Sequence, residues 1–304
     1  MREFVIDERT TGQRLDRLTG KLLGGAGHGL VQKLVRKGVV KLNGKRARGA
    51  EIVRVGDVVR IFLSEERIVG LEAKQRAIHS EAGGLDIVYE DADILVVNKP
   101  VGVLSQPSGP GPQGSLVERA ALYMHDRGET HHRPAAANRL DRNTSGLVVM
   151  GKHPAALARL GRDFRSRAVS KTYIALVVGE VREAFAVEGY ISRDESANVS
   201  SISKEGKAVS ASFAPIAHRD GMSLVRCMLE TGRSHQLRAS LAHKGVPILG
   251  DPKYGIIPLN ERFGQKHQLL HCYMLEFADG QRYRAEPPWA FAEAIERIFG
   301  VVEL

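Results

Sequence analysis

The chain has 304 residues, 43% of them hydrophobic and 26% charged, which excludes a disordered or fibrous protein. At roughly 150 residues per domain, this length has room for about two compact domains. The apolar runs are too short for a membrane helix of ~18 to 20 residues, and the start has no apolar signal core, so we expect a cytoplasmic protein. Only Cys227 and Cys272 occur, too few for a disulfide framework or a thiolate zinc site.

The net charge of +9 suggests a polyanionic partner, either a nucleic acid or an anionic membrane. Residues 1–72 carry +6 of this charge, and nine basic but only two acidic residues lie between Lys33 and Arg60. Two interpretations remain open: a solvated charged face, or a surface that follows phosphates and gives affinity without base specificity. The residues of the second interpretation are Lys33, Arg36, Lys37, Lys41, Lys45, Arg46 and Arg48.

The first elements form a compact helix and hairpin pattern. Apolar residues at helical spacing over 30–35 predict a helix that ends by Gly38, and residues 39–42 predict a short strand. Asn43-Gly44 predicts a tight turn because both positions tolerate positive φ. Residues 53–62 alternate like a half-buried strand, and the polar, glycine-ended residues 64–84 predict a linker.

Three strings in this region carry a first resemblance: Arg14-Leu15-Asp16-Arg17-Leu18, residues 31–45 and Val55-Gly56-Asp57. They resemble the RNA-binding module first named from a small-subunit ribosomal protein, the S-four type. The resemblance implies an RNA-binding domain over residues 1–72.

From residue 85 to residue 304, strand-like runs dominate and helical stretches separate them. The predicted strands are 93–98, 147–150, 173–178, 210–216, 223–229 and 269–277, and the predicted helices are 116–127, 154–165, 234–244 and 288–299. Because the strands mostly follow one another directly, we expect an α/β (α+β) fold whose mixed, largely antiparallel central sheet is flanked by helices and loops.

Two patterns that hint at cofactors fail on their context. Gly109–Gly114 has the glycine spacing of a dinucleotide-binding loop, but its two prolines remove N–H donors and no acidic ribose partner clearly follows. The histidines His125, His131 and His132 lack carboxylate or thiolate partners at metal-ligand spacing. We therefore expect no cofactor and no metal.

Two polar segments are the candidates for chemistry. In Asn138–Met150, a loop with one carboxylate, Asp141, between Arg139 and Arg142 runs into an apolar strand that would hold it at a sheet edge. Taken alone, this aspartate could equally stabilise a turn. The segment 231–245 predicts a turn and a helix with Ser234 as N-cap, and Arg238 lies one turn in, where its guanidinium can reach a partner.

The neighbours of Arg238 have less distinct roles. His235 is expected to be a structural hydrogen bonder rather than a base. The Gly/Pro-rich loop 247–255 must close over something or pack tightly.

These segments, with 93–102 and 170–175, resemble the RluA-type pseudouridine synthases, and the module order is similar to the ribosomal large-subunit synthases of types C and D. The resemblance implies a catalytic domain over residues 85–304 in which Asp141 is the catalytic aspartate, Tyr173 the active-site tyrosine and Arg238 the partner of the aspartate. It places Arg139 near the gap left by a flipped base. Asn138 departs from the histidine usual in the family, which affects local hydrogen bonding more than activity.

Forming pseudouridine breaks a carbon–nitrogen bond and remakes the link through ring carbon five, without redox change. The aspartate can attack the sugar, attack the ring or stabilise a glycal-type intermediate, and the sequence does not choose between these routes. It must be ionised in each, which a nearby arginine favours. Tyr173 can assist removal of the proton on carbon five or stack on the base, or it is only a core aromatic.

The expected partner is RNA, with large-subunit ribosomal RNA as the first choice, and we expect a monomer without a membrane partner. A stacked base must be extruded at a cost of a few kcal/mol, which phosphate contacts and a plug such as Arg139 offset. The other substrate contacts are expected from Arg142, Arg233, His235 and Gln236. The alternatives are the same chemistry on transfer RNA and a noncatalytic RNA-binding assembly factor.

Overall fold

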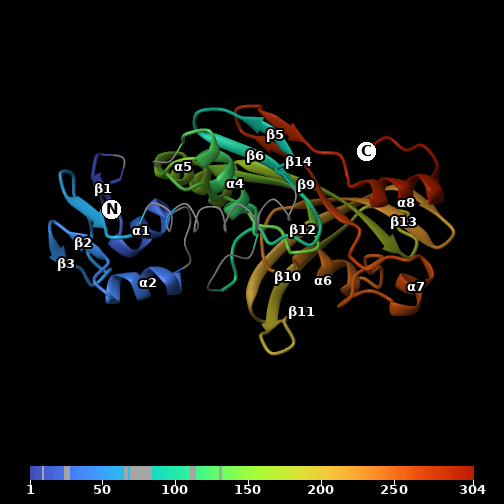
Figure 1. Cartoon of the computed structure of the whole chain (residues 1–304). Helices are drawn as coiled ribbons and strands as arrows, with labels where there is room; N and C mark the ends of the chain where they lie inside the picture. Colours follow the sequence, from blue (N-terminus) through green and yellow to red (C-terminus); the bar gives the residue numbers. More distant parts are fainter. Residues whose placement is uncertain (9, 24–27, 65–67, 69–83, 110–113, 130–131) are drawn as a thin grey trace.

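The structure is a computed structural model of the chain that describes residues 1–8, 10–23, 28–64, 68, 84–109, 114–129 and 132–304. It contains a four-stranded sheet near the N-terminus and an eleven-stranded sheet formed by the rest of the chain (Figure 1). The predicted linker at 64–84 lies mostly outside the described residues, as do His131 and most of the glycine-rich loop 109–114.

The small sheet has the strand order β1-β4-β2-β3, and all its neighbours are antiparallel. Its strands are β1 (Arg2–Val5), β2 (Val40–Leu42), β3 (Lys45–Arg46) and β4 (Val58–Ile61). Helices α1 (Leu15–Leu22) and α2 (His28–Arg36) share one buried apolar cluster with these strands. This cluster is separate from the clusters of the large sheet, so the small sheet has its own core.

The hairpin turn and the strand after it test two predictions in this region. Asn43 and Gly44 have φ values of 50° and 76°, so the predicted tight turn is confirmed. The strand predicted over 53–62 is paired only from Val58 to Ile61. Residues 54–57 form a turn instead, because Gly56 has a φ of 86° and the Asp57 carboxylate accepts the Arg54 N–H at 2.7 Å.

The large sheet runs β11-β10-β12-β13-β9-β14-β8-β6-β5, with β7 beside β8 and β15 beside β14. Its strands are β5 (Ile87–Glu90), β6 (Ile94–Lys99), β7 (Ala135–Ala136), β8 (Ser145–Gly151), β9 (Val169–Val178), β10 (Phe185–Asp194), β11 (Val199–Ser203), β12 (Lys207–Arg219), β13 (Met222–Leu229), β14 (Leu270–Phe277) and β15 (Arg282–Arg284). Among the described strand pairs, β8–β14 alone is parallel. The predicted mixed, largely antiparallel fold is therefore confirmed.

Helices cover both faces of this sheet. They are α4 (Leu116–Asp126), α5 (Pro154–Arg165), α6 (Gln236–His243), α7 (Ile257–Arg262) and α8 (Trp289–Phe299). Side chains alternate along β9: Tyr173 packs in the cluster with α4, α5 and α6, whereas Ile174 packs in the cluster with α8. A strand that is buried on both faces has little need of polar alternation, which explains the continuous apolar run after Tyr173.

Candidate functional site

Asp141 lies in the turn that leads into β8, and hydrogen bonds within the turn and from a neighbouring loop hold this turn in place. The Thr144 N–H donates to the Asp141 carbonyl at 3.1 Å, which closes the turn. Ser105 Oγ bonds both the N–H and the carbonyl of the preceding Leu140, each at 3.0 Å. The Asp141 side chain remains 29% exposed, so a ligand can approach it from solvent.

A buried lysine supports the same loop. Lys99, at the end of β6, is 0% exposed, and its ammonium donates to the carbonyls of Pro100, Val103 and Arg142 at 2.8, 2.9 and 3.0 Å. Burial lowers the pKa of Lys99 to about 7, although the charge of Asp141 opposes this shift. The three bonds use all the donors of an ammonium group, so Lys99 joins the loop after β6 to the loop that carries Asp141.

Asn138 lies at the start of this loop, where its side chain forms the hydrogen bonds to β8 that a strand backbone would otherwise form. Its amide donates to the Leu147 carbonyl at 3.1 Å, and its carbonyl oxygen accepts the Val149 N–H at 2.8 Å. These two bonds continue the short β7–β8 pairing where the backbone leaves the sheet. Asn138 therefore has a local structural role at the start of this loop.

Arg238 approaches Asp141 from the first turn of α6. Its Nη1 donates to Asp141 Oδ2 at 2.9 Å, across 97 residues of sequence. The arginine side chain is 5% exposed, whereas the carboxylate is partly open to solvent. The expected contact between the two groups is thus present.

A second carboxylate, which the sequence did not single out, holds the other side of the guanidinium. Asp251 is 0% exposed and accepts from Arg238 Nε at 2.6 Å and from Nη2 at 2.8 Å. Burial alone lowers the pKa of Arg238, but its hydrogen bonds and charge interactions with Asp251 and Asp141 outweigh that effect and raise it. Arg238 is therefore a fixed cation between a buried and an open carboxylate.

The start of α6 differs from the prediction. The helix begins at Gln236, and its N-cap is His235 in a left-handed conformation, with φ 57°, rather than Ser234. No side chain caps this end in the usual way. Instead Gln236 Oε1 accepts from the Arg233 N–H and the Thr231 hydroxyl, and its Nε2 donates to the Ser210 carbonyl. Gln236 thereby ties the turn to β12.

The other predicted substrate contacts lie at or near the surface. Arg139, Arg142 and Arg233 are exposed, and Arg233 Nε donates to the Ala208 carbonyl at 3.3 Å. His235 Nε2 lies 3.9 Å from Asp141 Oδ2. The structure thus brings His235 and Arg238 next to Asp141. Arg139 and Arg142 flank this aspartate in the sequence.

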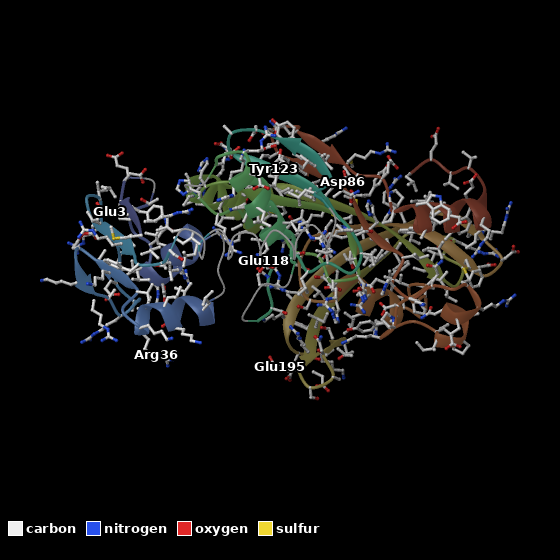
Figure 2. The ribbon with its side chains drawn as sticks, in the orientation of Figure 1. Glu3, Arg36, Asp86, Glu118, Tyr123 and Glu195 are labelled. Carbon is white, nitrogen blue, oxygen red and sulfur yellow. The ribbon has the colours of Figure 1, made fainter. Side chains whose placement is uncertain are left out.

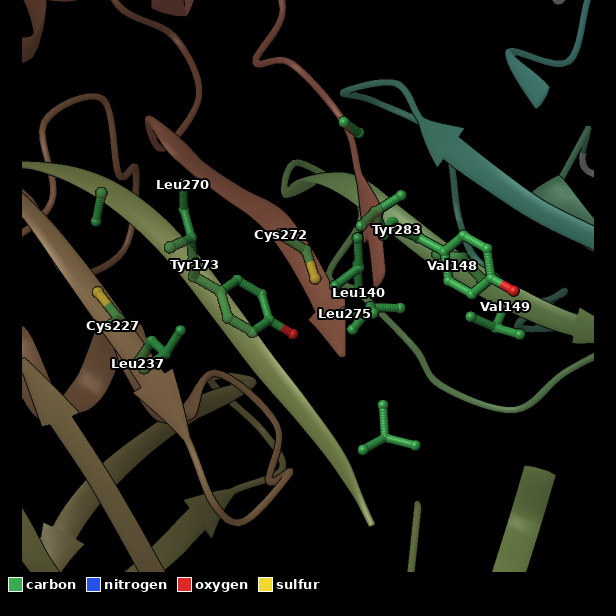
Figure 3. Packing of buried hydrophobic residues seen from close by; sticks show 14 of the residues in the cluster. Leu140, Val148, Val149, Tyr173, Cys227, Leu237, Leu270, Cys272, Leu275 and Tyr283 are labelled. Carbon is green, nitrogen blue, oxygen red and sulfur yellow. The ribbon is translucent and has the colours of Figure 1, made fainter. Parts of the chain in front are cut away.

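Tyr173 lies in the core beneath this site. Its ring packs among Cys227, Leu237 and Cys272, and it is 5% exposed (Figure 3). Burial, then the neighbouring Cys272 and the charge of Asp141, raise the pKa of Tyr173 well above its ordinary value. The phenol is therefore neutral in the folded protein.

The basic residues predicted to contact RNA lie on the small sheet and α2. Six of the seven are exposed, and Lys41 is half-buried with its ammonium 5.1 Å from the centre of the Phe62 ring. Figure 2 shows Arg36 on the outer surface at the end of α2. In the described part of the chain, none of the seven side chains forms an ion pair, so their charge is available to a partner.

The described residues show neither a metal-ligand cluster nor a membrane-spanning helix. These residues contain no group of three histidine, cysteine or carboxylate side chains arranged to hold a metal ion. No helix among them is long and apolar enough to cross a bilayer.

Comparison with known proteins gives concordant matches. The family model described as RNA pseudouridylate synthase matches residues 93–243. The chain is 34% identical to an uncharacterized RNA pseudouridine synthase of Chloroflexus aurantiacus, covering 90% of this chain and 84% of the relative. It is 31% identical to the ribosomal large subunit pseudouridine synthase D of Yersinia pestis, covering 89% and 85%. The solved structure of human RNA pseudouridylate synthase domain containing 1 matches with a TM-score of 0.58 and 25% identity, over 68% of this chain and 84% of that one.

Proposed function

This chain belongs to the RNA pseudouridylate synthase family and is an isomerase, and from that premise we propose that it converts specific uridines of large-subunit ribosomal RNA into pseudouridine. The choice of RNA is supported by the Yersinia pestis relative, whose name specifies the ribosomal large subunit. The observation that carries the proposal is the open Asp141 carboxylate held at 2.9 Å by a buried arginine.

The proposed reaction needs one reactive carboxylate and no outside reagent. The bond between N1 of uracil and C1′ of ribose breaks, a bond between C5 and C1′ forms, and the proton leaves C5 while N1 ends protonated. Asp141 Oδ2 is engaged by Arg238, whereas Oδ1 has no hydrogen-bond partner in the described residues. Oδ1 is therefore the oxygen that we assign to the nucleotide, whether it attacks the sugar, attacks the ring or stabilises a glycal.

Tyr173 and the loop arginines receive supporting roles. Because the buried Tyr173 is neutral, we assign it to contact with the base as a phenol, not as a phenolate base. Arg139 and Arg142 are exposed beside Asp141, where one can fill the space left by the extruded base and both can reach phosphates. Arg233 and Gln236 remain predicted substrate contacts.

Residues 1–72 would supply most of the sequence-independent affinity as an S-four-type RNA-binding domain. Their core is separate from that of the large sheet. Arg14 and Arg60 are paired with Asp16 and Glu3, whereas the seven basic side chains predicted to contact RNA form no ion pair within the described residues. Phosphate contacts give affinity but little sequence information, so the choice of uridine falls to the site around Asp141.

The test is to map pseudouridines in total RNA from cells with and without this protein, and then with the Asp141→Ala and Asp141→Asn variants. We expect specific ribosomal positions to lose pseudouridine in both variants, while RNA binding by the purified proteins stays largely intact. Loss confined to transfer RNA would favour the transfer-RNA alternative. Undiminished product with Asp141→Ala would refute the role of the carboxylate, and RNA binding without any product from the wild type would favour a noncatalytic assembly factor.

A further inference from the structure

His235 has one ring nitrogen that faces Asp141 and is not committed to the protein. Its side chain is 12% exposed, and Nε2 is 3.9 Å from Asp141 Oδ2, which is beyond hydrogen-bond distance. In the described part of the chain, Nε2 has no hydrogen-bond partner, whereas Nδ1 lies 3.0 Å from the Tyr254 hydroxyl. Whether Nε2 is a donor or an acceptor therefore depends on what Tyr254 does with its proton.

The hydrogen bonds of the Tyr254 hydroxyl determine which ring nitrogen of His235 carries the proton. Its hydroxyl oxygen accepts the Ser200 N–H at 2.6 Å, so the oxygen already has a donor. Burial raises the pKa of Tyr254, but the Ser200 side chain also hydrogen-bonds this hydroxyl and acts to lower that pKa, as a donor does. With both Ser200 groups donating to the oxygen, the one hydroxyl proton of Tyr254 goes to His235 Nδ1, 3.0 Å away. A neutral imidazole whose Nδ1 accepts a hydrogen bond carries its proton on Nε2.

Burial of the ring, with two cations nearby, keeps His235 neutral. Burial lowers the pKa of His235; the charge of Asp141 opposes this, and those of Arg238 and Lys253 reinforce it. The charge of Asp251 also acts to raise the pKa of His235, but it is the smallest of these effects, and Asp251 accepts two hydrogen bonds from the guanidinium of Arg238. At neutral pH the ring therefore presents a neutral N–H donor 3.9 Å from the Asp141 oxygen that Arg238 also engages.

We propose that Tyr254 is a positioning residue that fixes the tautomer of His235, so that His235 Nε2 donates a hydrogen bond to a carbonyl oxygen of the flipped uracil. This rests on the proposed function, because it assigns a protein donor to a carbonyl of the uracil base. Cytosine has an amino group where uracil has one of its carbonyls, so a fixed donor there favours uracil. An extruded base is commonly recognised through hydrogen bonds of this kind.

The first experiment compares two tyrosine variants on an RNA that the wild type modifies. Tyr254→Phe keeps the ring, whose centre is 5.0 Å from the guanidinium carbon of Arg238, and removes only the hydroxyl. We expect kcat to fall about 10- to 100-fold with little change in KM, because a misassigned tautomer removes one donor. Tyr123→Phe likewise removes one tyrosine hydroxyl, which donates to Glu90 at 2.6 Å, and is the control that should keep its kcat. Unchanged kcat in Tyr254→Phe would overturn the proposal.

The second experiment separates the donor from the backbone at position 235. A glutamine side chain can place an N–H near the position of Nε2, whereas asparagine is too short. The left-handed backbone, with φ 57°, favours asparagine over glutamine. We therefore expect His235→Gln to retain roughly tenfold more activity than His235→Asn, against the order of backbone strain. Equal activities, or a more active asparagine variant, would count against the donor.

A third readout does not depend on activity. In ¹⁵N NMR of the histidine-labelled full-length protein, the His235 signals, assigned by their loss in His235→Gln, should report a protonated Nε2 and a bare Nδ1. Tyr254→Phe should yield a mixture of tautomers. A wild-type signal with the proton on Nδ1 overturns this inference alone, whereas an enzyme that forms no pseudouridine on any RNA overturns the proposed function together with the uracil contact.

Discussion

Arg238 has a fixed direction because two carboxylates share its planar guanidinium. Asp251 engages Nε and Nη2, and these two bonds leave Nη1 pointing at Asp141. A lysine could not reproduce this geometry, because an ammonium group is a point charge without a planar fork. The direction of the guanidinium that contacts the Asp141 carboxylate is thus set by Asp251, which solvent cannot reach.

Removing Asp251 should therefore be costly. In Asp251→Ala, the guanidinium stays buried without its two-point partner, and we expect a loss of roughly 3 to 5 kcal/mol in the free energy of unfolding. Urea denaturation measures this value. The control is Glu276→Ala, which breaks an exposed pair with Arg282 and should change stability by less than about 1 kcal/mol. Similar losses in both variants would contradict the structural role of Asp251.

His271 predicts a pH effect on stability. It is buried between the Ser145 hydroxyl, 2.9 Å from Nδ1, and the Ala285 carbonyl, 2.8 Å from Nε2, and burial lowers its pKa from 6.5 to about 4. Between these values the unfolded chain binds a proton that the folded chain does not. The contribution of His271 is thus complete above pH 6.5 and is lost as the pH falls to 4, by roughly 3 kcal/mol in total.

The variant His271→Gln removes this titration but keeps a neutral donor and acceptor in the core. Free energies of unfolding measured from pH 7 to pH 4.5 should fall less steeply for the variant than for the wild type. Parallel curves would show that His271 does not titrate as its surroundings imply.

The start of β8 lies so close to β14 that it requires a glycine at position 146. Gly146 has φ 111°, and a Cβ there would lie 2.3 Å from the Cys272 carbonyl oxygen, which belongs to the rigid backbone of β14. We expect Gly146→Ala to cost more than about 3 kcal/mol by thermal or urea denaturation.

Gly44 provides the matched comparison for that substitution. It also has a positive φ, 76°, but nothing lies within 4 Å of an added Cβ. Gly44→Ala should therefore cost only about 1 kcal/mol from backbone strain. Equal losses in the two variants would mean that the contact with β14 relaxes and does not constrain the turn.

Elements with strong local signals could be predicted from the sequence. The helix predicted at 116–127 has a capping box formed by Ser115 and Glu118, and the one predicted at 154–165 starts with a proline. The β10–β11 hairpin was missed, as were β5, β7, β15 and α7. Burial alternates along β10, but the sequence hides this pattern, because Gly189 takes an inward position and the apolar Tyr190 is exposed.

The site also contains some residues that the sequence indicated and others that only the structure reveals. Residue chemistry pointed to Asp141 and to an arginine in need of a partner, but family resemblance, not spacing, paired Asp141 with Arg238 across 97 residues. Asp251 and Tyr254 lay in a loop expected only to pack or to close. Their roles arise from tertiary contacts, with Arg238 and with Ser200, that no local pattern encodes.

For the whole molecule, the uneven charge predicts how affinity responds to salt. Removing one cation that binds a phosphate should reduce the slope of log K against log salt by about 0.7 to 0.9. We expect the triple variant Lys33→Gln, Arg36→Gln and Lys37→Gln to weaken RNA binding and flatten this slope, and deletion of residues 1–72 to do so further. Filter binding or fluorescence anisotropy between roughly 50 and 200 mM salt measures the slope, because the affinity of such complexes changes steeply over this range.

A variant with the same reduction in charge tests whether position matters. Arg159, Arg182 and Arg282 are each already paired with a carboxylate, and replacing all three by glutamine removes three positive charges from residues 85–304. This control should retain a steeper salt slope than the α2 variant. Equal slopes would assign the effect to net charge alone.

The place of β14 in the large sheet has a consequence for biosynthesis. This strand lies between β8 and β9, although it is made long after both. While a ribosome is still translating residues before Leu270, the sheet has an open slot, and the two halves that carry Asp141 and Arg238 lack the strand that joins them. A nascent chain should therefore be inactive, and the protein would act on RNA only after β14 has left the ribosome and paired with β8 and β9.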